Sequence, residues 1–290
     1  MSSAGSIVLP EKLSESRRAA LLNLLADENP AIYQTVREKI LSYGPQAAGW
    51  LRPHILSSDP ALRRRAQEIV LHFDRQAADN RFLAFCLRHG EDFDLEHAAW
   101  LLAQTQYPDI NMAAYEALLD SYANELRERL DLGAEAKQTL ATINKYLFRE
   151  LGFTGNDENY YDPQNSYLNR VIDQRKGNPI NLCLLYILLA RRLRLPIAGI
   201  GLPGHFLCRY QSISAELYID AFNGGKFLSK ADCVQYLVRG KHSLNEDYLT
   251  PTNPRRILLR ICGNLHQIYL RLELVEETTR VQRYLVALAR

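Results

Sequence analysis

Two residues in the second half of the chain, His205 and Asp220, have the chemistry of a general base and of the partner that orients it. Each lies at the end of a strand-like run, because Phe206–Tyr210 follows His205 and Glu216–Asp220 ends at Asp220. If these runs form a hairpin that turns at Gln211–Ser214, the two side chains face each other with Cβ atoms about 5 Å apart. A histidine held by a carboxylate can take a proton from a nucleophile or from water.

The register of this expected hairpin follows from the side chains that it pairs. Arg209 lies opposite Glu216, and Leu207 lies opposite Tyr218, so opposite charges and apolar groups both match. The histidine–aspartate pair then either serves a reaction or only fixes the hairpin. The spacing alone leaves both interpretations open.

A catalytic cysteine would belong in the first turn of the helix that starts at Asn178 and Pro179, an N-cap residue followed by proline. Backbone N–H groups and the positive end of the helix dipole converge there and would help to ionise a thiol. The chain instead has Pro179, Ile180 and Asn181 in that turn, and Cys183 follows among apolar neighbours. We expect Cys183 to be a small core residue. The alternative is that it acts as a nucleophile.

A polar, turn-rich loop at residues 152–166 precedes this helix and includes two adjacent tyrosines. Long loops with aromatic side chains often line binding sites, although such tyrosines can also pack over the core of a simple connector. We expect contacts to substrate or peptide from the loop, from the start of the helix and from the turn before the histidine. The candidate binding residues are Asn156, Tyr160, Tyr161, Asn165, Asn181, Pro203 and Gly204.

The elements that must position these residues are a buried helix and the two strands. The run Ile180–Leu195 is apolar on nearly every side, which suits only a helix inside the protein. Helices are also expected before it, at Ala134–Leu151 and Tyr167–Arg175, and after the strands, at Lys230–Arg239. The sequence therefore predicts a buried helix packed on a hairpin of two strands.

The first half of the chain has only helical patterns. Residues 27–41 and 57–71 align as an internal repeat, with Pro30 on Pro60 and apolar residues at helical spacing. Such a repeat resembles a HEAT-type array, in which neighbouring helices bury a shared core. A further separate helix is expected at Asn80–His89.

The composition and the charge of the chain limit the classes of protein to which it can belong. With 290 residues, of which 47% are apolar and 23% charged, the chain is an ordinary globular sequence long enough for more than one structural unit. A net charge of +2 argues neither for nor against a nucleic-acid partner, but the lack of a basic recognition helix argues against one. The apolar stretches are far shorter than the ~20 residues of a bilayer span, and the first residues do not read as a secretory signal.

The five cysteines are odd in number, widely spaced and form no Cys-x-x-Cys pair. This usage is typical of free thiols in a reducing cytosol rather than of disulfides or of a zinc site. We therefore expect a cytoplasmic protein that has no metal, no cofactor and no contact with a membrane.

Four stretches in order, GFTGNDENYYDPQNSYLNRVI, RKGNPINLCLLYILLARRL, PGHFLCRY and YIDAFNGG, resemble the SirB-type proteins, which are bacterial cytoplasmic proteins built on a transglutaminase-like core. The resemblance is close over roughly residues 134–240. It implies a fold that is α+β and mostly α, with a papain-like core in which a central buried helix packs on a small antiparallel sheet. Helical repeats before the core and a tetratricopeptide-like hairpin after it are also implied.

The resemblance also implies the roles of the site residues. In active transglutaminase-like enzymes the catalytic cysteine opens the central helix two residues after a glycine, and that position is Pro179 here. The usual histidine and aspartate match His205 and Asp220. Proline cannot attack a carbonyl, so the resemblance implies a pseudoenzyme that binds peptide or protein. The alternative is an active hydrolase or acyl-transferase that uses His205 and Asp220 with Cys183 or with water.

The end of the chain is expected to form two helices, Pro254–Leu272 and a second one that ends at Arg290. Such a hairpin resembles one tetratricopeptide unit, and it can also simply cap the core. The expected domains are a helical, HEAT-like segment at residues 1–133, a transglutaminase-like core at residues 134–245 and the helical hairpin at residues 246–290.

Overall fold

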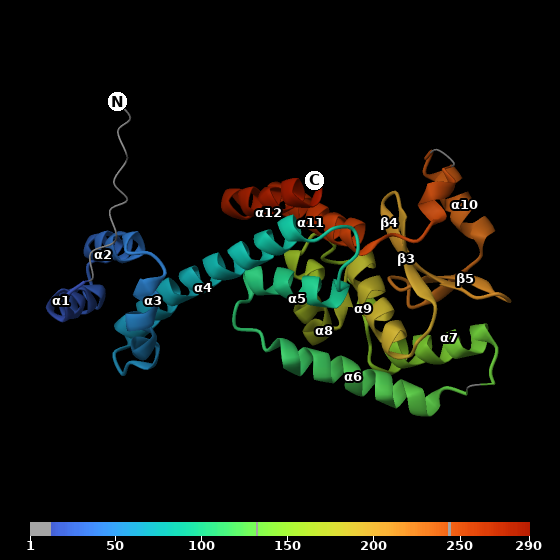
Figure 1. Ribbon diagram of the computed structural model, residues 1–290, viewed down its shortest axis with the longest axis horizontal. Coiled ribbons are helices and arrows are strands. Elements are labelled where there is room, and N and C mark those ends of the chain that lie inside the picture. The colour runs from blue at the N-terminus through green and yellow to red at the C-terminus, as the bar shows by residue number, and fades with distance from the viewer. Residues whose placement is uncertain (1–12, 132, 243–244) are drawn as a thin grey trace. The chain divides into compact units, whose positions relative to one another are not determined.

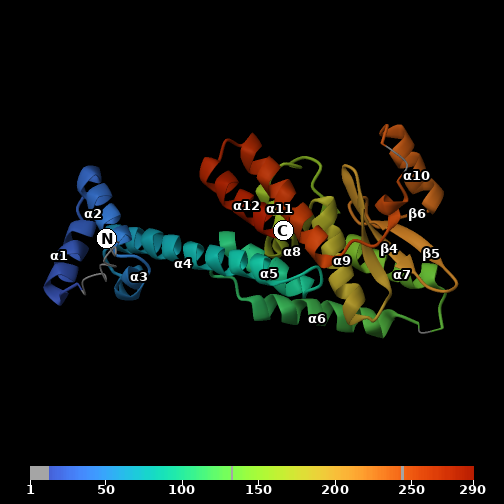
Figure 2. The same cartoon turned by 45° about the horizontal axis from the view of Figure 1, so that its top comes forward.

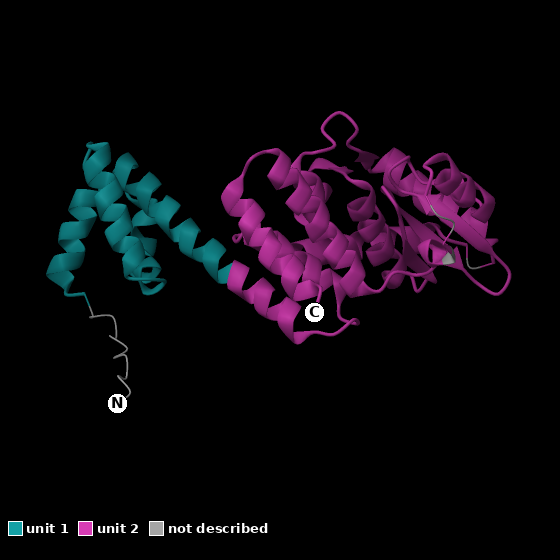
Figure 3. Cartoon of the chain, turned by 90° about the horizontal axis from the view of Figure 1, so that it is seen from above, with its two compact units in different colours: residues 1–78 teal, residues 79–290 magenta. Residues whose placement is uncertain are grey.

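The computed structural model describes residues 13–131, 133–242 and 245–290. The chain divides into two compact units, one that ends at Ala78 and one that starts at Asp79 (Figure 3). The predicted domain boundaries, after residues 133 and 245, both fall inside the second unit. The three-domain division is therefore still only a prediction.

The helices of the first unit begin where the repeat predicts. Asn29 and Asp59 accept backbone N–H groups at the starts of two helices, and proline follows each of them. Val36 and Ala66, which occupy matching positions in the repeat, are both buried in the core of this unit. The HEAT-type interpretation is not tested by this agreement. The unit contains α1 (Glu15–Leu25), α2 (Pro30–Ser42), α3 (Gln46–Leu51), a 3-10 turn (Arg52–Leu56) and the first part of α4 (Pro60–Arg88).

The prediction of a separate helix at Asn80–His89 is wrong, because α4 continues without a break from Pro60 to Arg88. The polar residues near Asp79 looked like a new helix start. No glycine or proline interrupts the stretch that follows Pro60, so nothing ends the helix there. The single helix α4 thus crosses the division between the two units.

The second unit is organised around α9 (Pro179–Arg192), in which every residue from Pro179 to Ala190 is buried. This confirms the prediction of a buried central helix. The strands β3 (Ile197–Leu202) and β4 (His205–Gln211) cover one side of α9, and other helices cover the rest (Figure 1). Those helices are α5 (Leu95–Gln106), α6 (Met112–Arg129), α7 (Ala136–Asn144) with a π-helical extension (Lys145–Glu150), α8 (Leu168–Gln174) and α11 (Pro254–Arg271).

The main sheet is antiparallel and has the order β3-β4-β5-β6, with β5 at Glu216–Asp220 and β6 at Lys226–Leu228. The hairpin of β4 and β5 was predicted, whereas β3 and β6 were not. A short parallel pair, β1 (Thr154–Gly155) and β2 (Lys176–Gly177), joins the two ends of the segment before α9. Helix α10 (Lys230–Arg239) follows the sheet, as predicted.

The predicted register of the β4–β5 hairpin is wrong by two residues, since Arg209 pairs with Tyr218 and Gln211 pairs with Glu216. The cause is the turn, which occupies Ser212–Ala215 rather than Gln211–Ser214. The Ser212 N–H donates to the Ala215 carbonyl over 2.9 Å, and the Ser212 hydroxyl oxygen accepts from the Ala215 N–H over 3.1 Å. A two-residue shift keeps every side chain on its own face of the sheet. Arg209 and Glu216 therefore still form an ion pair of 2.7 Å, now between diagonal neighbours.

Helices α11 and α12 (Val275–Leu288) form the expected hairpin at the end of the chain (Figure 2). Their apolar faces belong to the same core cluster as α9, which includes Leu258, Leu265 and Tyr284. The hydroxyls of Tyr269 and Tyr167 also share a hydrogen bond of 2.8 Å. The hairpin thus packs on the central core, and its tetratricopeptide-like interpretation stays untested.

The fold is α+β and mostly helical, with a buried helix against a small antiparallel sheet, as predicted from the sequence. All five cysteines are buried and free. Across the part of the chain that the structure describes, no helix has the length and the apolar character needed to cross a bilayer. In the same residues, His, Cys, Asp and Glu side chains nowhere gather in a group that could hold a metal ion.

Candidate functional site

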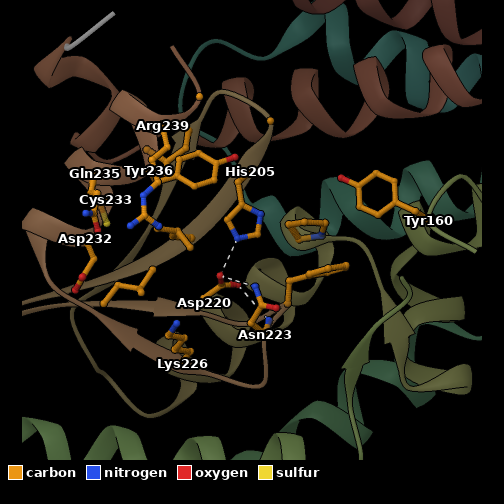
Figure 4. Close-up of a pocket in the computed structure, with 17 residues that line it drawn as sticks. Tyr160, His205, Asp220, Asn223, Lys226, Asp232, Cys233, Gln235, Tyr236 and Arg239 are labelled. Carbon is orange, nitrogen blue, oxygen red and sulfur yellow. Dashed lines mark hydrogen bonds and ion pairs between the residues drawn. The ribbon is translucent and has the colours of Figure 1, made fainter. Parts of the chain in front are cut away.

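A cavity of about 840 Å³ lies where the main sheet, α10 and the loop before α8 meet (Figure 4). His205 and Asp220 line it together with Tyr160, Pro179 and Gly204, which the sequence also singled out. The other lining residues are Leu202, Leu207, Phe222, Asn223, Lys226, Leu228, Asp232, Cys233, Gln235, Tyr236, Arg239 and Gly240. The cavity is large enough for an extended segment of a few residues.

His205 and Asp220 are hydrogen bonded, with 2.9 Å between Nε2 of the ring and Oδ2 of the carboxylate. Both side chains are mostly buried, with exposed fractions of 14% and 8%. An ionised carboxylate can only accept, so Nε2 carries the proton and Nδ1 of the neutral ring has a free lone pair. No described residue is hydrogen bonded to Nδ1. The geometry is that of an oriented base, although a catalytic role for the pair is still a prediction.

The pair forms despite the wrong register in the predicted hairpin. His205 pairs in the ladder with Leu202 of β3, and Asp220 pairs with Lys226 of β6. Their side chains meet across the sheet as diagonal neighbours on one face, which long side chains can do. His205 and Asp220 are not directly opposite each other. They still meet because the two-residue shift leaves both side chains on the same face of the sheet.

Asp220 is held by more than the histidine. The Asn223 side chain donates to Oδ2 over 2.8 Å, and the Asn223 backbone N–H donates to Oδ1 over 3.2 Å. Burial alone would raise the pKa of Asp220, but the hydrogen bonds from His205 and Asn223 outweigh it and lower the pKa below its usual value. The carboxylate therefore stays ionised and keeps the ring of His205 in one orientation.

This lowered pKa predicts how stability depends on pH. The folded-state pKa of Asp220 lies below the unfolded value of about 3.9, so its stabilisation is present above pH ~4 and is lost as the pH falls through the folded pKa. We expect Asp220→Asn to lower the free energy of unfolding at pH 6 by about 1–2 kcal/mol and to flatten its fall between about pH 5 and 2. Urea unfolding at a series of pH values measures both effects.

The exposed Asp109, which has no hydrogen bond to other described residues, provides the control Asp109→Asn. An unchanged pH profile in Asp220→Asn would contradict the expectation.

Aromatic side chains enclose His205. The ring of Phe222 lies edge-on to it at 6.3 Å, and the ring of Tyr236 lies at 6.0 Å between centroids. Tyr236 is fixed by its hydroxyl, which donates to the carbonyl of Pro203 over 3.2 Å. Tyr160 stands on the far side of the cavity from α10 and packs edge-on against Phe222 (Figure 4). These rings give the cavity apolar walls beside its polar centre.

Four asparagines, two of them in the loop before α8 and two at the start of α9, are buried and bond to one another or to backbone. Asn156 donates to the Asn165 side chain over 2.9 Å, and Asn165 donates to the carbonyl of Tyr160. The Asn178 side chain caps α9 by accepting from the backbone N–H of Asn181 over 3.0 Å. Three of the predicted binding residues are thus buried and do not line the cavity, namely Asn156, Asn165 and Asn181.

The other predicted binding residues lie at or beside the cavity. Tyr160 and Gly204 line it directly, and the carbonyl of Pro203 positions Tyr236. Tyr161 is half-exposed and stacks under the guanidinium of Arg271, 4.1 Å from the ring centroid. Tyr161 therefore faces the C-terminal helices rather than the cavity.

The position expected for a nucleophile holds Pro179, at the first residue of α9, and this proline faces the same cavity as His205. Cys183 is fully buried, and its thiol donates to the carbonyl of Phe206 over 3.4 Å. It lines neither the large cavity nor the smaller one beside it. Cys233 borders the large cavity from α10, but it is itself buried, and burial raises the pKa of its thiol to about 12. Cys183 thus does not reach either cavity, and the thiol of Cys233 stays protonated at neutral pH.

A smaller cavity of about 180 Å³ adjoins the large one at Tyr160, Pro179, Gly204 and His205. Its inner wall is made by Ile180, Phe206, Arg260 and Asn264. Arg260 comes from α11 and donates through Nη2 to the carbonyls of Leu202 and His205, the two residues that flank the β3–β4 turn.

Sequence reasoning missed Asn223, Tyr236 and Arg260. Asn223 was within reach, because the side chain of an aspartate in a turn commonly accepts a backbone N–H from a residue shortly after it. Tyr236 and Arg260 carried no such signal. They belong to helices that reach the site only through the tertiary fold.

The family of the chain follows from its comparison with known proteins. The profile of the transglutaminase-like superfamily matches residues 113–263, which include the central helix, the sheet and both site residues. The chain belongs to the transglutaminase-like superfamily. This confirms the core that the SirB-type resemblance implied.

Several curated proteins are similar to this chain. A UPF0162 protein of Xylella fastidiosa is 39% identical over 188 residues, which cover 62% of this chain and 66% of that protein. A UPF0162 protein of Pseudomonas aeruginosa is 30% identical over 63% of this chain and 67% of its own length. The human F-box only protein 21 is 37% identical over 69% of this chain but only 36% of its own length. No solved structure matches the chain.

Proposed function

We propose that this chain is a SirB-type transglutaminase-like protein that has lost the nucleophile and binds an extended peptide segment of a protein partner in the cavity at His205. The observation that carries the proposal is Pro179, which stands at the start of α9 in the same cavity as the intact His205–Asp220 pair. The aromatic walls at Tyr160 and Tyr236 and the polar centre suit the backbone and side chains of a peptide.

The proposal also covers the helical segments that flank the core and the compartment in which the protein acts. Helical segments lie before and after the core, and we propose that they extend the surface available to a protein partner. Five free, buried cysteines favour a reducing compartment such as the cytoplasm. The proposed activity needs neither a metal nor a cofactor.

A second candidate function is hydrolysis by water without a covalent intermediate. It is supported by the unoccupied Nδ1 of His205, which could take a proton from a water molecule in the cavity. The assay below separates the two functions, since binding leaves a peptide intact and hydrolysis cuts it.

Binding is tested by fluorescence anisotropy with a pool of fluorescein-labelled octapeptides of randomised sequence. We expect the double variant His205→Ala/Tyr160→Ala to bind the pool about tenfold more weakly than the wild type, because two walls of the cavity are removed. The matched control is His72→Ala/Tyr43→Ala, whose residues lie in the first compact unit. Equal affinity of the site variant and the wild type would contradict the proposal.

Mass spectra of the incubated pool show whether peptides are cut. Cleavage that disappears in His205→Ala would establish the hydrolase instead.

A further inference from the structure

The carboxylates of the large cavity are already satisfied by the protein. Asp220 accepts hydrogen bonds from His205 and from Asn223. Asp232 accepts from the backbone N–H of Ser229 over 2.8 Å and from its hydroxyl over 2.6 Å, which completes the cap of α10. Each of these carboxylates therefore has hydrogen-bond donors within the protein.

The cations around the two cavities have no such partners. Lys226 and Arg239 stand at the exposed rim of the large cavity, and Arg260 stands inside the small one (Figure 4 labels the first two). Among the described residues, none of the three forms an ion pair with an acidic side chain. The charged groups with unused hydrogen-bond donors for a ligand are therefore cations.

Arg260 is the most informative of these cations because it is largely buried. A guanidinium has five N–H groups, and the Nη2 atom of Arg260 uses its two for the carbonyls of Leu202 and His205. Its Nε and Nη1 groups have no acceptor among the described residues, and the guanidinium lies 5.4 Å from the centre of the Phe206 ring. Burial lowers the pKa of Arg260. An anion beside it would oppose that effect and would satisfy the remaining N–H groups.

The surroundings of Arg260 suit one small anionic group. The cavity of about 180 Å³ has room for about six water molecules at ~30 Å³ each, which is the scale of a side chain or of a chain end. Asn264 and Tyr160 line it as well, and neither side chain is hydrogen bonded to another described residue. An amide and a hydroxyl can both donate to a carboxylate that pairs with the guanidinium.

We propose that the small cavity binds a carboxylate of the peptide ligand, with Arg260 as its ion-pair partner and Asn264 and Tyr160 as further donors. The inference rests on the proposed peptide-binding function and adds the chemical class that the ligand must present. The carboxylate belongs either to an acidic side chain or to a C-terminus, and both have the same chemistry at this site. Lys226 and Arg239 at the rim favour further acidic groups along the same ligand.

A purely structural role for Arg260 makes a different prediction. Its two carbonyl bonds tie α11 to the β3–β4 turn, and this alone would make it important for stability. Arg255 on the same helix is a matched case, because it donates to the carbonyls of Ala287 and Leu288, away from both cavities. If Arg260 only stabilises the fold, Arg260→Gln and Arg255→Gln should both lower stability. Neither should then change the selectivity for carboxylates.

The test uses the full chain and three pools of labelled octapeptides with randomised flanks, read by fluorescence anisotropy. One pool has a central Glu and an amidated C-terminus, the second has a central Gln and an amidated C-terminus, and the third has a central Gln and a free carboxyl terminus. We expect the wild type to bind one of the two carboxylate pools about tenfold more tightly than the neutral pool, the scale of one charge-assisted hydrogen bond. Arg260→Gln should remove this preference, and Arg255→Gln should keep it.

The outcomes separate the inference from the proposed function. Equal binding of all three pools by the wild type would overturn the carboxylate site while leaving peptide binding in place, and it needs no variant to fold. Binding of no pool would overturn both. A preference that survives in a folded Arg260→Gln protein would also overturn the assignment of Arg260. The pool that is preferred identifies the carboxylate as a side chain or as a chain end.

Discussion

Replacing Pro179 with cysteine is expected to create a thiol that reacts with iodoacetamide at pH 6 at least about 30-fold faster than an ordinary exposed cysteine. The new side chain would stand in the first turn of α9, below the Asn178 cap and in the same cavity as His205. The positive end of the helix and the adjacent imidazole both favour a thiolate there. Mass spectrometry of the alkylated protein measures the rate.

Two controls make the rate for Pro179→Cys interpretable. Ile213 at the tip of the β4–β5 hairpin is fully exposed, so Ile213→Cys supplies the ordinary thiol on the same protein. Adding His205→Ala to Pro179→Cys should slow alkylation by about tenfold if the ring assists ionisation. The five native cysteines are buried and should stay unmodified in the folded chain. Alkylation of Pro179→Cys no faster than that of Ile213→Cys would mean that the helix start and the histidine do not form a nucleophile site.

Replacing Gly225 with alanine is expected to lower the free energy of unfolding by about 3 kcal/mol or more. Gly225 has a φ of +77°, and a Cβ atom there would lie 2.5 Å from the side chain of Asn144. That side chain links three elements, because it donates to the Gly225 carbonyl over 2.6 Å and accepts from the hydroxyl of Tyr186 on α9 over 3.0 Å. The substitution therefore combines backbone strain with the disruption of a buried hydrogen-bond chain.

The neighbouring glycine separates these two contributions. Gly224 also has a positive φ, +66°, but a Cβ atom there would meet nothing within 4 Å. Gly224→Ala should therefore cost only the strain of the left-handed backbone, about 1–2 kcal/mol. Urea unfolding of both variants gives the comparison. Equal losses in the two variants would show that the contact with Asn144 contributes nothing.

The parts of the fold that local sequence encodes were predictable. The apolar run that became α9 could only be buried, and the alternating side chains of β4 and β5 placed His205 and Asp220 on one face. The register was missed because it depends on the hydroxyl of Ser212, which accepts hydrogen bonds inside the turn. The error did not separate the pair, since a shift of two residues preserves the face.

Other parts depend on contacts that no local pattern shows. Strand β3 has glycines where strands usually have branched or aromatic residues, and the reason is tertiary: a Cβ atom on Gly199 would lie 2.7 Å from the ring of Phe206. Arg260 lies 55 residues beyond His205 in sequence, yet donates to its carbonyl. The sequence-based interpretation treated the last two helices as a separate hairpin, and so it overlooked the wall that one of them gives to the site.

The buried asparagines around the cavity have a consequence for its response to pH. The bonds among Asn156, Asn165, Asn178 and Asn181 join amides and backbone groups, none of which gains or loses a proton under physiological conditions. The scaffold of the cavity is thus electrically neutral, and acid or base does not loosen these bonds. Between about pH 5 and 8, the hydrogen bonds that position the start of α9 and the loop around Asn165 therefore stay in place. The cavity keeps its form whatever charge a ligand brings.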